Sequence, residues 1–257
     1  MPDRIDSVQI DSVDSFRWIV PDWPAPANVK AASSLRSGGV SVGEYAALNL
    51  GDHVADDPLA VATNRERLQQ ALVLPASPKW LSQVHGIDCV DAASSPVGVD
   101  ADASFTTQAG VVSAVLTADC LPVLLCDKRG TTVAAVHAGW RGLAAGVIES
   151  TIAAMGRPHE IMAWLGPAIG PQQFEVGAEV RAAFIARDEA AVDAFLPARE
   201  GHWHANLYQL ARLILKKQGV SAIYGGEWCT VSSPEDFYSY RRDGVTGRMA
   251  TLIWMVD

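Results

Sequence analysis

The sequence predicts an α/β (α+β) sandwich with mixed β-sheets, folded as a single domain over residues 1–257. Short runs rich in β-branched residues alternate with segments of helical periodicity, a pattern typical of layered folds. Of the 257 residues, 49% are hydrophobic and 19% are charged, so the chain can bury a sizeable core and is not disordered. We find no internal repeat and no low-complexity linker that would divide the chain.

The first clear helix is predicted to begin at Pro58. Asp57 is a favourable acidic N-cap, and proline suits the first helical position because an N–H group there has no intrahelical partner. Apolar residues then recur at helical spacing, and Arg65 falls within the same segment. Ahead of this helix, Ser37-Gly38-Gly39 predicts a loop.

The middle of the chain predicts three strand-like stretches, which are followed by helices. The strand-like runs are residues 80–84 with 87–90, residues 111–116 with 123–126, and residues 131–136. Helical patterns follow at about 143–155, 179–196 and 207–218, the last with Asn206 as its N-cap. The tail from 222 to 256 predicts two or three short strands broken at Pro234 and Gly244, with a hairpin tip at residues 241–244.

Charge and cysteine content exclude several classes of function. The chain has 20 Lys and Arg against 29 Asp and Glu, a net charge of −9, whereas nucleic-acid and anionic-membrane binders need a basic face. A small local anion site is compatible with this balance. Four cysteines are too few for a disulfide scaffold in 257 residues, so we expect a reduced, cytoplasmic protein. Residues 1–22 lack the apolar core of a signal peptide, and the uncharged stretch 103–118 is shorter than a membrane span.

Three residues with metal-binding side chains lie where predicted strands break. His85, Cys120 and His137 each adjoin small or turn-forming residues, and loops at strand ends build pockets in α/β folds. Their separations of 35 and 17 residues match no zinc finger, but three ligands from separate loops suit an open catalytic zinc site. Six histidines allow one such centre and are few for a multi-copper cluster.

The same residues allow other interpretations, which their spacing leaves open. The simplest is a pair of packed histidines and a buried thiol. Cys120 beside a histidine is also the pattern of a cysteine nucleophile with its base, and Asp119 could then orient or assist. A copper electron-transfer site with two histidines and one cysteine is a further alternative.

Three more residues are candidates for substrate binding. Arg141, in Gly139-Trp140-Arg141-Gly142, lies between a predicted strand and a helix whose N-terminus would attract anions, although a tight turn with a solvated arginine is equally compatible. Arg65 could bind phosphate or pair with a neighbouring acid. Asn49 could hold a polar edge of the substrate or cap a turn.

Several ordered motifs together resemble a known family. They are Arg36-Ser37-Gly38-Gly39-Val40-Ser41, Leu48-Asn49-Leu50-Gly51, Asn64-Arg65, Ser82-Gln83-Val84-His85-Gly86, Thr117-Ala118-Asp119-Cys120-Leu121-Pro122, His137-Ala138-Gly139-Trp140-Arg141-Gly142, Gly166-Pro167-Ala168-Ile169-Gly170, Phe237-Tyr238-Ser239-Tyr240-Arg241-Arg242-Asp243-Gly244 and Thr246-Gly247-Arg248. Their combination resembles the laccase-domain family, also called the YfiH or polyphenol oxidase family, and the bacterial peptidoglycan editing factor. The resemblance covers about residues 35–257.

The resemblance implies a fold, a metal and an activity. The fold would be a single-domain α/β sandwich with mixed sheets, and zinc would be bound by His85, Cys120 and His137. Members of this family phosphorolyse adenosine, inosine, guanosine and S-methyl-5′-thioadenosine, and they deaminate adenosine. Purine nucleosides and phosphate would therefore be the partners, with Asn49 and Arg65 lining their site and Arg141 a further phosphate contact. Asp119 would transfer protons during deamination.

Other activities connected with the family stay open as alternatives. One is a copper-dependent polyphenol oxidase, or laccase. Another is a cysteine-type hydrolase acting on peptidoglycan precursors, with Cys120 and His137 as nucleophile and base. This chain also departs from many relatives: Gln172-Gln173 replaces cysteines, and Asn206 replaces an aspartate. The oligomeric state does not follow from the sequence.

Overall fold

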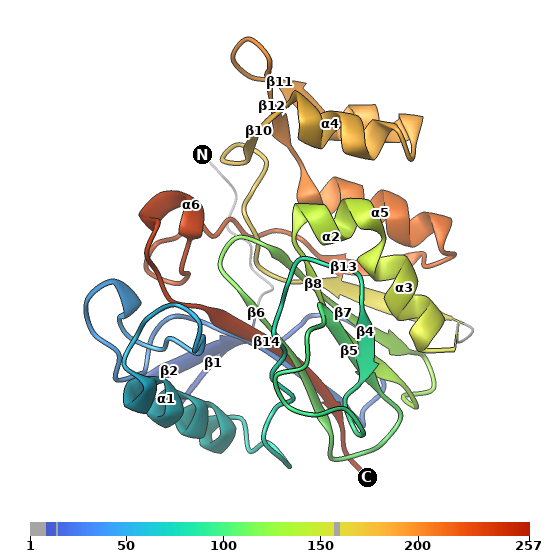
Figure 1. Cartoon of the computed structure of the whole chain (residues 1–257). Coiled ribbons are helices and arrows are strands. Elements are labelled where there is room, and N and C mark those ends of the chain that lie inside the picture. Colours follow the sequence, from blue (N-terminus) through green and yellow to red (C-terminus); the bar gives the residue numbers. More distant parts are fainter. Residues whose placement is uncertain (1–8, 14, 157–159) are drawn as a thin grey trace.

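The fold is a layered sandwich of mixed sheets and helices, as the sequence predicts. The computed structural model describes residues 9–13, 15–156 and 160–257, so part of the N-terminal segment 1–22 lies outside the described residues. A five-stranded antiparallel sheet has the order β1 (Ile10–Val13), β2 (Phe16–Ile19), β3 (Val29–Ser34), β14 (Met249–Met255) and β6 (Val112–Thr117) (Figure 1).

The second sheet is mixed and carries most of the candidate site. Its strand order is β13 (Ala222–Gly225), β9 (Ile161–Leu165), β7 (Leu121–Asp127), β8 (Val133–Ala138), β5 (Ala103–Thr106) and β4 (Cys89–Asp91). The outer pairs β13–β9 and β4–β5 are parallel, and the inner pairs are antiparallel. A small antiparallel sheet contains β10 (Glu175–Gly177), β12 (His202–Ala205) and β11 (Phe195–Pro197).

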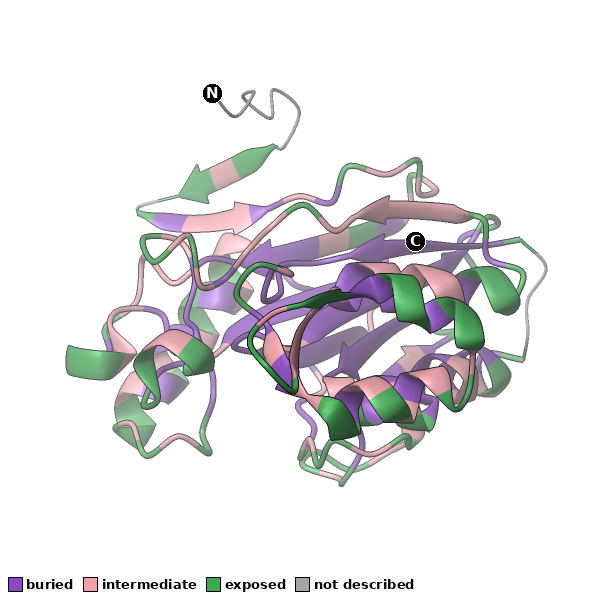
Figure 2. Ribbon diagram, turned by 90° about the horizontal axis from the view of Figure 1, so that it is seen from above, coloured by how far each residue is buried: buried purple, intermediate pink, exposed green. Residues whose placement is uncertain are grey.

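Three apolar cores hold these layers together. One lies between the two large sheets and joins Val115 and Ile253 to Leu124 and Met162. A second packs helices on the other face of the six-stranded sheet: α2 (Trp140–Ala145), α3 (Val147–Ala154), α4 (Ala178–Ile185) and α5 (Leu207–Lys217). The third packs α1 (Pro58–Ala71) on the outer face of the five-stranded sheet. Figure 2 shows the buried central strands between more exposed helices.

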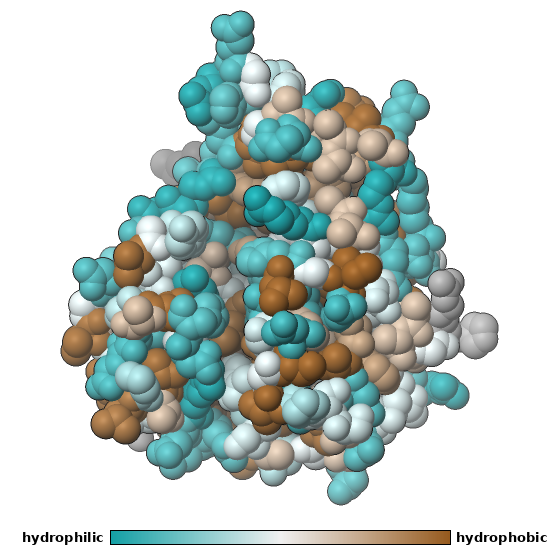
Figure 3. All heavy atoms as spheres, in the orientation of Figure 1, coloured by the Kyte–Doolittle hydropathy of each residue, from teal (hydrophilic) through white to brown (hydrophobic). Residues whose placement is uncertain are grey.

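The helix boundaries confirm two predicted caps. The Asp57 side chain accepts a hydrogen bond from the Leu59 N–H at the start of α1. Asn206 does the same for the Gln209 N–H at the start of α5. Within the described residues, no helix is long and apolar enough to cross a membrane. On the face drawn in Figure 3, hydrophobic residues are interspersed among hydrophilic ones.

Four local predictions are wrong. Residues 80–84 form no strand but a single isolated bridge at Ser82, because the Gln83 amide both donates to the Leu116 carbonyl and accepts from the Leu116 N–H in place of a backbone ladder. The helix predicted at 143–155 begins at Trp140 and breaks at Gly146, whose φ of 114° ends α2. The region 179–196 splits into α4, the 3₁₀ segment Glu189–Ala194 and β11.

The predicted hairpin tip at residues 241–244 is instead a short helix, α6 (Tyr240–Asp243). The Ser239 hydroxyl caps it by accepting from the Arg242 N–H, and Gly244 ends it with a positive φ of 71°. The sequence signals of a turn, a polar cluster followed by glycine, are also those of a single capped helical turn. A further 3₁₀ turn covers Gly43–Tyr45.

Candidate metal centre

His85, Cys120 and His137 come together at one end of the six-stranded sheet. Their potential ligand atoms all lie within 4.8 Å of one another. Cys120 ends the tight turn between β6 and β7, His137 is on β8, and His85 is in the loop before β4. The rings of His85 and His137 meet edge to face with centroids 4.9 Å apart.

The spacing of Cys120 and His85 is close to that of two ligands on one tetrahedral zinc ion. Zinc bonds of about 2.3 Å to sulfur and 2.0–2.1 Å to nitrogen place those two atoms roughly 3.5 Å apart. The Cys120 Sγ lies 3.8 Å from the His85 Nε2. His137 is buried, Cys120 is half-buried and His85 is exposed, so one side of the centre faces solvent. The donor set therefore suits a site with three protein ligands and an accessible fourth position.

The thiol and the buried imidazole shift each other's protonation. Burial alone would raise the pKa of Cys120, but the charge of His137 and hydrogen bonds from both histidines lower it to about 6. Burial lowers the pKa of His137, but Cys120 and Asp102 outweigh this and raise it to about 9. At neutral pH, Cys120 is therefore a thiolate, which is the form that binds metal ions and acts as a nucleophile.

Asp102 contacts two of the three candidate ligand residues, and sequence reasoning missed it. Its fully buried carboxylate lies 2.7 Å from the His137 Nδ1 and accepts a 3.0 Å hydrogen bond from the His85 N–H. Its other oxygen accepts from the Gly86 N–H at 2.6 Å and the Val84 N–H at 3.2 Å. With Nδ1 engaged by Asp102, the His137 Nε2 is left to face the centre. One signal was available, since an acidic residue directly precedes an apolar strand.

Two residues of the centre have left-handed backbone conformations. The φ angles are 61° for His85 and 88° for Asp119, although neither residue is glycine. Such conformations cost about 1–3 kcal/mol each and persist where surrounding contacts enforce them. Asp102 supplies those contacts to the His85 loop. The strain therefore indicates a loop that is held in position before any ligand binds.

Gly139 has no side chain, so its backbone can lie close to the side chains of His85 and Cys120. Leu121 pairs with Ala138, so Cys120 lies next to Gly139. A Cβ atom on Gly139 would lie 2.9 Å from the His85 Cδ2 and 3.0 Å from the Cys120 Sγ. The backbone of Gly139, with φ −59° and ψ 154°, would itself accept alanine.

We therefore expect Gly139→Ala to fold normally and to bind zinc about 10-fold more weakly or worse, because the ligands are pushed apart. Competition with a chelator measures the affinity, and far-UV circular dichroism checks the fold. Gly86→Ala is the control, since its Cβ would meet Asp102 Oδ2 and Val84 Cγ2 at ordinary contacts of 3.4 and 3.5 Å. Equal affinity in the Gly139 variant and the native protein would contradict the steric role.

Asp119 connects the cysteine turn to the C-terminal segment. Its Oδ1 accepts from the Thr230 hydroxyl at 2.5 Å. Its Oδ2 accepts from the Ser239 hydroxyl at 3.0 Å and from the Arg241 N–H at 2.6 Å. These bonds fix the turn that presents Cys120.

Asn49 and Arg65 lie together beside the loop that follows Asn49. The fully buried Asn49 amide donates to the Gly51 carbonyl and to Asp56, and it accepts from the Gly51 and Arg248 N–H groups. All of its hydrogen-bonding positions are thus used within the protein.

The two candidate arginines differ in their surroundings. The Arg65 Nε donates to the Leu50 carbonyl, its Nη2 lies 3.2 Å from Asp52, and its guanidinium stacks on the Trp80 ring at 4.4 Å. Arg141 is exposed on α2, where its guanidinium lies 4.5 Å from the centre of the Trp140 ring. The structure therefore does not bring Asn49, Arg65 and Arg141 into one contact group.

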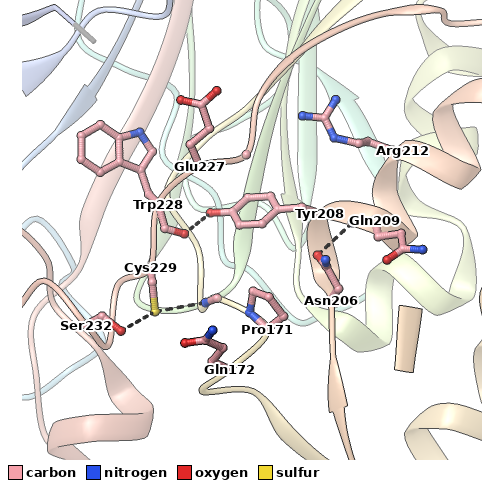
Figure 4. Close-up of a pocket in the computed structure, with 12 residues that line it drawn as sticks. Pro171, Gln172, Asn206, Tyr208, Gln209, Arg212, Glu227, Trp228, Cys229 and Ser232 are labelled. Atoms are coloured by element: carbon pink, nitrogen blue, oxygen red, sulfur yellow. Dashed lines mark hydrogen bonds between the residues drawn. The ribbon is translucent and has the colours of Figure 1, made fainter. Parts of the chain in front are cut away.

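Gln172 and Asn206, where the sequence departs from many relatives, line a separate cavity of about 440 Å³ between α5 and the segment that follows β13 (Figure 4). Cys229 lies at its edge, where its sulfur accepts from the Gly170 N–H at 3.3 Å and the Ser232 hydroxyl at 3.2 Å. Tyr208 forms part of the wall with its hydroxyl bonded to the Trp228 carbonyl. None of the residues lining this cavity is one of the three metal-ligand candidates.

Comparisons with known proteins identify the family. A family model described as multi-copper polyphenol oxidoreductase laccase matches residues 30–256. The chain is 54% identical over 242 residues to a purine nucleoside phosphorylase of Pseudomonas aeruginosa, covering 93% of this chain and 99% of the relative. It is 53% identical over 240 residues to the purine nucleoside phosphorylase YfiH of Escherichia coli, covering 93% and 98% of the two chains.

Solved structures agree with the sequence matches. A Neisseria meningitidis protein of the DUF152 family has a TM-score of 0.90 and 54% identity, covering 93% of this chain and 99% of its own. YlmD from Geobacillus stearothermophilus has a TM-score of 0.87 and 30% identity, covering 97% and 99% of the two chains. The chain therefore belongs to the laccase-like family that includes YfiH, as its ordered motifs predicted.

Proposed function

We propose that this protein is a zinc-dependent purine nucleoside enzyme. It would phosphorolyse adenosine, inosine, guanosine and S-methyl-5′-thioadenosine, and it would deaminate adenosine. The observation that carries the proposal is the cluster of His85, Cys120 and His137, whose ligand atoms lie within 4.8 Å of one another, in a chain whose relatives are named purine nucleoside phosphorylases. When bound, the ion would supply a Lewis acid towards a polar atom of the substrate or of water.

Zinc is favoured over copper by the surroundings of the donor set. Blue-copper sites with two histidines and one cysteine add a weak axial ligand, often methionine. Met249 leads into the strand beside the cysteine turn, but its sulfur accepts a 3.1 Å hydrogen bond from the Tyr238 N–H inside the apolar core. Two imidazoles and one thiolate are a complete set for an open zinc site.

The protein groups would bind and orient the reactants. In phosphorolysis, a phosphate oxygen bonds to the ribose C1′ while the bond from C1′ to the purine nitrogen breaks and its electron pair leaves with the base. In deamination, water adds to the purine C6 and ammonia leaves with the proton that the water gives up. Asp119 is our proposed carrier of that proton, since it adjoins Cys120 and its Oδ1 takes a single hydrogen bond among the described residues. Asp102 would keep His137 in place during both reactions.

The test is chromatography of purine nucleosides incubated with purified protein of known zinc content, with and without phosphate. The proposal predicts free base and a pentose phosphate only when phosphate is present. It also predicts inosine from adenosine in either condition. Survival of every nucleoside despite about one zinc per chain would overturn the proposal.

Arg65 is the phosphate-orienting residue that the sequence proposes. We expect Arg65→Ala to raise the phosphate KM several-fold and to affect adenosine deamination less, because deamination uses no phosphate. The matched control is Arg67→Ala, two residues further along α1, where an exposed guanidinium donates to the Gly38 carbonyl. Equal losses in the two reactions would count against a phosphate role for Arg65.

A specific observation supports a second candidate function. Asp102, His137 and Cys120 form a carboxylate–imidazole–thiolate series like that of cysteine hydrolases, with the carboxylate 2.7 Å from the His137 Nδ1. The alternative is therefore a hydrolase of peptidoglycan precursors. In that case, zinc would inhibit the hydrolysis of muropeptide precursors. Hydrolysis of these precursors that needs added zinc would overturn this alternative. Oxygen uptake with a phenol after copper loading would instead identify a polyphenol oxidase.

The proposal includes a cytoplasmic location and small-molecule partners. All four cysteines are free, which supports a reducing compartment. The net charge of −9 supports small anionic and nucleoside partners over nucleic acid.

A further inference from the structure

Arg248 lies beside the cysteine turn because of strand register. Met249, the first residue of β14, pairs with Thr117, the last residue of β6. Beyond that pair, Arg248 extends along the backbone that continues through Ala118 and Asp119 to Cys120. The side chain thus starts at the edge of the proposed metal centre, and the sequence named Arg248 only as part of the Thr246-Gly247-Arg248 motif, without a role.

The backbone of Leu50 and Gly51, a short strip, connects Arg248 to Arg65 and His53. The Leu50 N–H donates to the Arg248 carbonyl at 3.1 Å, and the Leu50 carbonyl accepts from the Arg65 Nε at 3.0 Å. The next residue, Gly51, lies beneath two side chains. A Cβ atom there would lie 2.7 Å from the Arg248 Cγ and 3.4 Å from the His53 Cε1. The absence of a side chain at Gly51 therefore lets Arg248 and His53 lie close together.

The two arginines differ in how far their donors are already used. Arg65 has its Nε on the Leu50 carbonyl and one face on an indole ring, and its Nη2 is buried 3.2 Å from Asp52 without making a hydrogen bond. Arg248 uses Nη1 on the carbonyls of Thr246 and Gly247. For its Nε and Nη2 we find no acceptor among the residues that the structure describes. Arg248, half-buried, thus keeps two donors on one edge of its guanidinium for a two-point contact to an oxyanion, whereas the unpaired Nη2 of Arg65 is buried.

The local charge also favours an anion here. The protein carries a net charge of −9, yet two guanidinium groups gather around Gly51; Asp52, whose side chain is 63% exposed, pairs with Arg65, and the Asp119 carboxylate acts on Arg248. Burial lowers the pKa of Arg248, and the opposing influences come from Cys120, Asp119 and two tyrosines. A half-buried cation with free donors is stabilised when an anion binds to it.

We infer that Arg248 binds the phosphate co-substrate directly, with His53 as a neighbouring donor and Arg65 as the residue that holds the strip in place. The inference rests on the proposed function. It places the phosphate between Gly51 and the cysteine turn. It assigns the direct contact with phosphate to the Nε and Nη2 of Arg248, and a supporting role to Arg65.

The experiment has a binding arm and a kinetic arm, both on the zinc-loaded full chain. Inorganic phosphate alone is titrated by calorimetry into the native protein, Arg248→Met and Arg248→Lys, with the exposed Arg67→Met as control. We expect Arg248→Met to weaken phosphate binding and to raise the phosphate KM by about 10-fold or more, and Arg248→Lys to lie between. Zinc content and the inosine KM should stay within about twofold, which a general structural defect would not allow.

Gly51→Ala provides a second variant in case Arg248→Met does not fold. Its Cβ would displace the Arg248 stem while leaving the guanidinium in the chain, so it should weaken phosphate binding as well. Unchanged phosphate affinity in the folded variants, with phosphate-dependent base release by the native protein, would overturn the inference and leave the proposed function intact. If the native protein neither binds phosphate nor needs it for base release, both fall.

Discussion

Cys120→Ala is expected to abolish zinc binding and both proposed activities. The thiolate is the anionic ligand of the proposed centre, and its pKa of about 6 keeps it ionised at neutral pH. Two imidazoles alone bind zinc poorly, so the loss should exceed the roughly 10–100-fold that removing an outer-shell partner costs. Zinc quantification of the purified variant and nucleoside chromatography measure the two effects.

The matched control for this prediction is Cys229→Ala. Cys229 is also a free thiol, but it lies at the edge of the separate cavity and its sulfur accepts hydrogen bonds from Gly170 and Ser232. It should keep zinc and activity. Full retention of both by the Cys120 variant would overturn the zinc proposal. Retained zinc with lost activity would point instead to Cys120 as a nucleophile.

Asp102→Asn is expected to damage the centre without touching any proposed ligand atom. The Asp102 oxygens face four N–H donors, so either orientation of an asparagine amide points its own NH₂ group at a donor. We expect zinc affinity to fall about 10–100-fold, because His137 loses the partner that orients it. The free energy of unfolding should fall by about 2–3 kcal/mol, because a buried donor is left unpaired.

Asp127→Asn separates these two effects. Asp127 is likewise fully buried and accepts from the Thr131 N–H, the Thr131 hydroxyl and the Thr132 N–H, but it lies at the opposite end of β7 from the cysteine turn. This control should lose stability and keep its zinc affinity. Chelator competition and urea unfolding give the two quantities. Equal zinc affinity in both variants would show that Asp102 acts on the fold alone.

The sequence predicted what local patterns can encode. The caps at Asp57 and Asn206 confirmed the starts of α1 and α5, and breaks in apolar runs located His85, Cys120 and His137. These signals are short-range, since a cap or a strand end is read from a few neighbouring residues.

Contacts made across the sheets could not be predicted in this way. Asp102 reaches His137 because Ala103 pairs with Val136, a register between strands more than thirty residues apart. Arg248 reaches the cysteine turn through the pairing of Met249 with Thr117. A single sequence does not state which strands pair, so the supporting carboxylate and the free guanidinium emerged only from the fold. The wrong strand at residues 80–84 has the same origin, because a side-chain amide replaced the ladder there.

The position of β14 gives the protein an order of assembly. This strand comes after the other described strands, yet it lies inside its sheet, between β3 and the edge strand β6. The segment just before it supplies the Ser239 and Arg241 donors that fix Asp119. During synthesis, β3 and β6 leave the ribosome before β14, so the position between them in the sheet is filled last. The cysteine turn therefore takes its final form only after β14 has inserted between β3 and β6, so the centre matures after the strands that carry its ligands.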